Sequence, residues 1–159
     1  MFSATTEMIK YFGSDVKRIN HALKVYGFAL SIAETEQVSE EVKEVICLLA
    51  ALHDIGIKAA EEKYNSSAGK YQEIEGPPIA KQILENGGVQ TNTINRVCYL
   101  IGNHHSYQNI DGLDFQVLVE ADFLVNIFED CMDKDSINSI KQKYFKTTSG
   151  LKYLESMYL

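Results

Sequence analysis

The feature that most constrains the fold is a helix that is apolar around most of its circumference and ends on two polar residues. Ser39 is a favourable N-cap residue, and the two glutamates after it suit the positive end of a helix dipole. The apolar positions that follow, up to Leu52, occupy more than one stripe, which predicts a central helix ending near Gly56. His53 and Asp54 then lie at the end of a buried helix, where an unpaired carboxylate is costly.

Helical periodicity of apolar residues covers most of the remaining chain, and no segment alternates with the period of two that marks a β-strand. The polar segment 58–72 is expected to be exposed, and the prolines of "EGPPIAKQILENGG" are expected at the first positions of the next helix. Further helices are expected at about 15–33, with Ser14 or Asp15 as the N-cap, and at about 91–105, 115–129, 136–145 and 151–157.

The length of 159 residues and a hydrophobic content of 45% suit one domain with a core of its own. We therefore predict an all-α fold, a single-domain irregular bundle of crossed helices over residues 1–159. Its core is expected at 15–130, with the C-terminal helices at 131–159 packed on that core.

Composition excludes several classes of function. A net charge of −7 argues against a partner that is a nucleic-acid polymer, because such a partner requires a basic face. The apolar runs are shorter than the roughly 20 residues that span a bilayer, so no membrane partner is expected. The N-terminus lacks the pattern of a signal peptide, and the three cysteines have no CxxC spacing. A cytoplasmic protein is the prediction.

The chemistry is expected at buried acids and histidines. Asp54 and Asp122 both lie in apolar helical surroundings, where an unpaired aspartate is rare. A divalent cation would neutralise both carboxylates and accept the imidazole nitrogens of His21 and His53. The negative end of the helix dipole also favours a cation beside His53. Such a mixed nitrogen and oxygen set suits Fe, Mn, Co, Ni or Zn.

Three separated stretches resemble the HD-domain metal-dependent phosphohydrolases. These are His21, "LHDIG" at 52–56 and "EADFLVN" at 120–126, and the resemblance covers roughly residues 15–130. It implies that His21, His53, Asp54 and Asp122 are the metal ligands. It also implies an all-helical fold of the HD-domain type and the hydrolysis of phosphate esters.

A second stretch, "IGNHHSY" at 101–107, is similar to the branches of this family that bind two metal ions. Those branches usually carry another histidine at the start of the intervening helix, where this chain has Glu73 and Glu75. His104, His105 and Glu73 are therefore candidates for a second metal or for the substrate, and one or two ions are expected. Ile57 stands where the "HDIGK" branches have lysine, which argues against the cyclic-dinucleotide phosphodiesterases.

Each of these assignments has an ordinary structural alternative. His53 and Asp54 would serve equally as a helix-end capping pair, and Asp122 as the partner of a lysine or arginine. His104 and His105 suit the negative end of a helix dipole, and Glu73 and Glu75 suit a first helical turn. The tyrosine-rich C-terminus suggests packing or an oligomer face, so a homodimer remains open.

The expected reaction is hydrolysis of a phosphate ester by a metal-activated water, with Asp54 orienting that water or accepting its proton. Lys58 and Lys70 follow the His-Asp pair and are candidates for binding phosphate. A small phosphorylated molecule, above all a nucleotide, is the expected substrate. The alternatives are a di-iron oxygenase on the same scaffold and a non-catalytic domain that binds metal or nucleotide.

Overall fold

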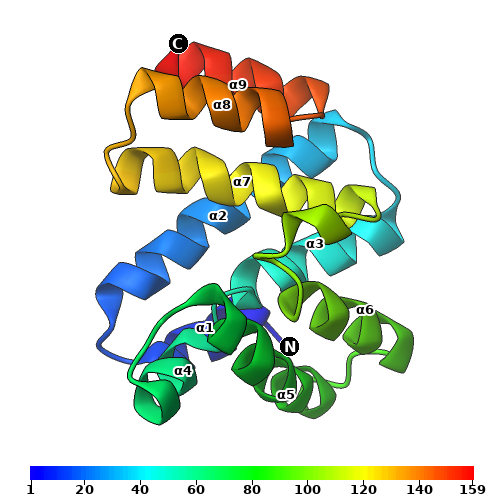
Figure 1. Cartoon of the computed structure of the whole chain (residues 1–159). Helices are drawn as coiled ribbons and strands as arrows, with labels where there is room; N and C mark the ends of the chain where they lie inside the picture. Colours follow the sequence, from blue (N-terminus) through cyan, green and yellow to red (C-terminus); the bar gives the residue numbers. More distant parts are fainter.

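The computed structural model describes all 159 residues and contains nine α-helices, one short 3-10 helix and no strand, which confirms the all-α prediction. Figure 1 shows α8 and α9 on the outer side of α7, with α1, α4, α5 and α6 grouped toward the other end of the molecule. The elements are α1 (Ala4–Phe12), α2 (Val16–Thr35), α3 (Glu40–Leu52), α4 (Ile57–Tyr64), α5 (Gly69–Asn86), α6 (Thr91–Ile101), the 3-10 helix η1 (Tyr107–Asn109), α7 (Leu113–Glu129), α8 (Lys134–Tyr144) and α9 (Thr148–Tyr158).

Helix α3 lies at the centre of the fold, as its apolar circumference predicts. It packs against α1, α2, α6 and α7, and every residue from Leu48 to Leu52 is buried. One continuous hydrophobic cluster extends from Ala4 to Leu154, so the C-terminal helices share the core of the rest of the chain. No helix combines the length and the apolar character that a membrane span requires.

Two predicted N-caps determine where the helices that carry the histidines begin. The Asp15 carboxylate accepts a hydrogen bond from the Arg18 backbone N–H at 3.3 Å, and α2 starts at the next residue, Val16. The Ser39 hydroxyl accepts from the Val42 N–H at 3.3 Å at the start of α3. Such caps satisfy backbone donors that have no partner within the helix. They fix the residue at which each helix begins and therefore the direction in which its side chains point.

Helix α3 ends earlier than predicted, at Leu52 instead of near Gly56. His53 is the C-cap, and the chain then continues through tight turns in which the Ile57 N–H donates to the Asp54 carbonyl at 3.0 Å. Gly56 permits this path, because a Cβ there would lie only 2.5 Å from the backbone nitrogen of Gly76. His53 and Asp54 therefore lie on a turn that packs closely against α5.

The prediction for α5 was wrong in its start, and α1 was not predicted. Pro77 and Pro78 lie inside α5, which already begins at Gly69. The earlier turns form because Gln72, Glu75 and Gly76 are buried against the rest of the molecule, and this packing compensates for the helix hydrogen bonds that the prolines remove. Most of the segment expected to be exposed is also helical, because α4 spans Ile57–Tyr64 and α5 begins at Gly69.

Candidate metal centre

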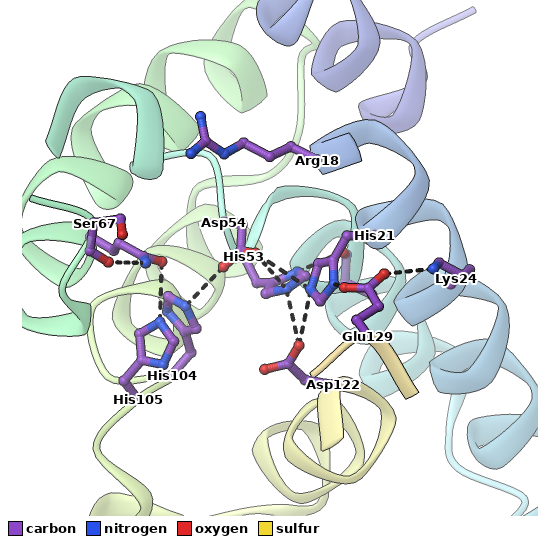
Figure 2. Close-up of polar contacts among 12 residues, drawn as sticks. Arg18, His21, Lys24, His53, Asp54, Ser67, His104, His105, Asp122 and Glu129 are labelled. Atoms are coloured by element: carbon purple, nitrogen blue, oxygen red, sulfur yellow. Dashed lines mark hydrogen bonds and ion pairs between the residues drawn. The ribbon is translucent and has the colours of Figure 1, made fainter. Parts of the chain in front are cut away.

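Three helices bring the four predicted ligands together. His21 lies on α2, His53 and Asp54 follow α3, and Asp122 lies on α7. His21 Nε2 is 3.1 Å from Asp122 Oδ1 and 3.5 Å from Asp54 Oδ2. His53 Nε2 is 3.5 Å from Asp54 Oδ2 and 3.7 Å from Asp122 Oδ1. Figure 2 shows these side chains converging on one point from separate elements.

Two buried imidazole nitrogens in this cluster have no hydrogen-bond partner. His53 Nδ1 donates to the Ala50 carbonyl at 2.9 Å, and His104 Nδ1 donates to the Ile101 carbonyl at 2.7 Å. Each ring is thereby oriented so that Nε2 faces the carboxylates, and both Nε2 atoms are unpaired. Buried polar atoms almost always have a partner, so an unpaired ring nitrogen that faces a carboxylate marks a position suited to a cation. The donor set fits a divalent metal ion.

Asp54 belongs to two groups of candidate ligands. Its Oδ2 faces His21 and His53, while its Oδ1 lies 3.4 Å from His104 Nε2. The ligand atoms of His21, His53 and Asp54 lie within 4.8 Å of one another, and so do those of Asp54, His104 and His105. The arrangement can therefore hold one ion, or two ions that share Asp54.

The electrostatics of the cluster without metal are those of ion pairs. Burial alone would lower the pKa of His53, but the neighbouring charges of Asp54 and Asp122 outweigh it and raise that pKa to about 9. Burial alone would raise the pKa of Asp54 and of Asp122, but the adjacent imidazoles lower both below their ordinary values. Burial, together with the charge of His104, lowers the pKa of His105 to about 4. The carboxylates are thus held ionised, in the form that binds a metal.

Sequence reasoning missed the carboxylate that orients His21. His21 Nδ1 donates to Glu129 Oε2 at 2.8 Å, and Lys24 Nζ lies 2.5 Å from the other Glu129 oxygen. Figure 2 shows Glu129 between Lys24 and the His21 ring. This contact selects the tautomer that leaves Nε2 free for a metal and makes the ring a stronger ligand. A signal existed, because Glu129 follows Asp122 by seven residues and so lies on the same face of α7.

The predicted candidate Glu73 supports the second group of ligands without joining it. Helix α6 ends at Ile101, so His104 and His105 lie in the turn that follows. Glu73 accepts hydrogen bonds from the His105 backbone N–H at 3.0 Å and from the Ser106 hydroxyl at 2.9 Å, which anchors this turn. The side chain that reaches His105 is instead Gln72, whose Oε1 lies 3.1 Å from His105 Nε2.

Glu75 is turned away from the centre. Its carboxylate accepts from Lys63 Nζ at 2.7 Å and from the Tyr64 hydroxyl at 3.0 Å, which ties α4 to α5. The segment that borders the centre between these helices is thereby held in place.

The structure does not bring Lys58 and Lys70 to the centre. Both are exposed, and their ammonium groups lie over the rings of Tyr11 and Tyr71, at 5.5 and 4.7 Å from the ring centroids. A cavity of about 520 Å³ opens beside the cluster, and the cations that line it are Lys17 and Arg18 on the first turn of α2. Arg18 pairs with Asp15 and with Glu61, and these pairs hold its guanidinium at the rim.

The comparisons with known proteins agree with this geometry. The sequence profile of the HD domain family matches residues 18–138, which include all four predicted ligands. A crystal structure of a predicted HD superfamily hydrolase from an uncultured Thermotogales bacterium superposes with a TM-score of 0.66 and 22% sequence identity. The superposition covers 98% of this chain and 81% of that one. No curated protein matches the sequence. The family profile and the shared fold together show that the chain belongs to the HD domain family.

Proposed function

We propose that the protein is a metal-dependent phosphohydrolase that cleaves the ester bond of a small phosphorylated molecule. The observation that carries this proposal is the pair of unpaired Nε2 atoms, on His53 and His104, that face Asp54 from its two sides. His21, His53, Asp54 and Asp122 would hold a divalent Fe, Mn, Co, Ni or Zn ion, and His104 and His105 surround the second position. A bound ion of this kind makes water more acidic and polarises a phosphoryl oxygen.

Asp54 would orient the attacking water. Its side chain reaches the opening of the cavity, whereas the His53 side chain is fully buried. The lowered pKa of Asp54 keeps its carboxylate ionised, so that it can accept a hydrogen bond from water but is a weak base. It would therefore align the water toward phosphorus, and the proton would leave to solvent through the open side of the cavity.

Lys17 would contact the phosphoryl group in place of the lysines expected from the sequence, and Arg18 beside it would add positive charge. Both line the cavity, but the terminal nitrogens of Arg18 already donate to Asp15 and Glu61, which leaves Lys17 as the cation for a phosphate oxygen. His105 is neutral at pH 7 because its pKa is lowered to about 4, so it would act as a ligand or a hydrogen-bonding group and not as a cation.

One observation favours a second candidate, a di-iron oxygenase. Asp54 lies between two groups of ligands and both groups contain histidine, which is an arrangement that two irons can share. Elemental analysis that finds two irons in each chain, together with an absorption band of a mixed-valent pair, would support this alternative. A non-catalytic domain would instead bind metal or phosphate ester without turnover.

The test is phosphate release by purified protein loaded with Mn²⁺, Co²⁺ or Fe²⁺, with p-nitrophenyl phosphate and small phosphomonoesters as substrates. We expect turnover that Asp54→Asn reduces more than about a thousandfold, because the change removes a carboxylate shared by both ligand groups. Asp135→Asn, on the exposed surface of α8, is the matched control and should retain full activity. Turnover that survives Asp54→Asn, or its absence with every metal and ester, contradicts the proposal.

A further inference from the structure

The cavity beside the metal centre has a wall that indicates which kind of phosphate ester it accepts. We propose that the substrate is a phosphomonoester whose remaining part is rich in hydroxyl groups, such as a sugar or polyol phosphate, and carries no flat base. This inference rests on the proposed function and specifies its substrate class.

The first observation is the near absence of apolar surface from this cavity. Thirteen residues line its roughly 520 Å³, and Ile57 is the one hydrophobic residue among them. No phenylalanine, tyrosine or tryptophan contributes to the lining. Pockets for flat heterocycles are mostly apolar and aromatic, because a base gains much of its binding free energy from stacking and from leaving water. Ile57 alone offers a nucleobase little apolar surface, and the flat side chains of His105 and Arg18 are engaged in hydrogen bonds with Gln72 and Glu61.

The second observation is a stripe of hydrogen-bonding side chains that leads away from the metal centre. Asp122, Asn126 and Asp130 recur every four residues at the end of α7, so they face the cavity as one row. The Asn126 amide and the Asp130 carboxylate make no hydrogen bond within the protein, and neither does the Ser67 hydroxyl that also lines the cavity. Amide, carboxylate and hydroxyl groups together can donate to and accept from adjacent hydroxyls of a sugar or polyol.

The third observation is the charge of the wall, which limits the number of phosphates. The lining includes five carboxylates but only two basic side chains besides the histidines. Asp15 is paired with Arg18 and Glu129 with Lys24, while Asp54 and Asp122 face the metal position. Asp130 has no cationic partner. One phosphate can be matched by the metal ion and Lys17, but further phosphates would meet Asp130 and be repelled.

The experiment compares ribose 5-phosphate with adenosine 5′-monophosphate, because the two esters share the reacting group and the sugar and differ in the base. p-Nitrophenyl phosphate serves as a substrate without hydroxyls. With metal-loaded protein, we expect kcat/KM for ribose 5-phosphate to exceed that for the nucleotide at least tenfold. Equal or faster hydrolysis of the nucleotide overturns the inference and leaves the proposed function intact. No turnover of any of the three contradicts the proposed function, and the inference falls with it.

A variant tests the role of the α7 row directly. Asn126→Leu keeps the approximate size of the side chain but removes its donor and acceptor. We expect the ratio of kcat/KM for ribose 5-phosphate to that for p-nitrophenyl phosphate to fall about fivefold to tenfold, the range of one or two neutral hydrogen bonds. Asn138→Leu, on α8 and outside the cavity, should leave the ratio unchanged. An unchanged ratio in Asn126→Leu contradicts the assignment of the row to hydroxyl binding.

Discussion

Glu120 and Asp122 lie two residues apart on α7, and both are carboxylates withdrawn from water, but they are stabilised in different ways. Glu120 is fully buried, and its oxygens accept hydrogen bonds from the backbone N–H groups of Lys146 and Thr147, at 2.6 and 2.9 Å, and from the Thr147 hydroxyl at 2.5 Å. Gln116 Nε2 adds a fourth bond at 2.7 Å. All of these donors belong to groups that do not titrate near neutral pH.

Asp122 instead faces two imidazoles, and one of them, that of His53, has a buried nitrogen without a partner. Its Oδ1 lies 3.1 Å from His21 Nε2 and 3.7 Å from His53 Nε2. The comparison shows how a buried carboxylate saturated by its own fold differs from one in a candidate metal centre. The oxygens of Glu120 are fully hydrogen-bonded, mostly to the turn between α8 and α9. Asp122 and the unpaired nitrogen beside it could instead both coordinate an added cation.

The largest expected difference between Asp122 and Glu120 is in how much added metal raises the free energy of unfolding. For the wild-type protein at a free-metal concentration of 100 times Kd, binding should raise the free energy of unfolding by about 2.7 kcal/mol. We expect Asp122→Asn to lose this gain, since the amide replaces a charged ligand. Urea unfolding with and without Mn²⁺ measures it.

The matched control is Glu120→Gln, which makes the same chemical change two residues away. It should lower the free energy of unfolding by about 2 kcal/mol without metal, because hydrogen bonds to a charged acceptor are replaced by weaker neutral ones. The metal-induced gain should remain as in the wild type. If Glu120→Gln abolished the metal-induced gain, or Asp122→Asn kept it, the assignment of metal binding to Asp122 and not to Glu120 would be wrong.

The second effect is the pH dependence of the metal-free protein, which should arise beside Asp122 and not beside Glu120. The pKa of His53 is raised from 6.5 to about 9 in the folded protein, so its contribution to stability is complete below pH 6.5 and is lost as the pH rises through 9. We expect the free energy of unfolding to fall by about 2 to 3 kcal/mol over this range, since one pKa unit corresponds to about 1.4 kcal/mol.

The measurement is urea unfolding of chelator-treated protein at several pH values between 6 and 9.5. His53→Asn removes the titrating ring and should flatten the curve. Saturation with metal should also reduce the slope, because metal binding requires the deprotonated imidazole. A metal-free curve that stays flat or rises between pH 6.5 and 9 would contradict the ion pairing assigned to His53.

The smallest of these effects concerns Glu129, which supports the Asp122 cluster from outside. Glu129→Gln can still accept from His21 Nδ1 but loses the charge that Lys24 and His21 share. We expect the metal Kd to rise about tenfold, and more in Glu129→Leu, because partners that orient a ligating histidine typically contribute 10 to 100-fold in affinity. Titration against a competing chelator measures it, with Glu155→Gln, which pairs with Lys141 outside the cluster, as control. Unchanged affinity in both Glu129 variants would leave Glu129 with a packing role alone.

The predictions that succeeded from sequence depend on local rules. Ser39 was recognisable as a cap, and the first cap was narrowed to Ser14 or Asp15, because a side-chain oxygen before a helix satisfies nearby backbone donors; the structure uses Asp15. The central position of α3 followed from apolar residues on more than one stripe. The start of α5 could not be predicted in this way, because burial of Gln72 and Gly76 against distant residues outweighed the usual preference of prolines for a helix start.

The same division applies to the metal centre. By itself, the sequence determined the all-α class and the candidate helix caps, because these follow from residue types and their spacing, and its resemblance to the HD-domain family identified the candidate ligands. Only the tertiary structure decided which side chains share a point in space. It placed Arg18 at the cavity instead of Lys58 and Lys70, and it placed Glu129 behind His21. The physical reason is that helix crossings and turn geometry, which depend on packing over the whole core, determine the direction of each side chain.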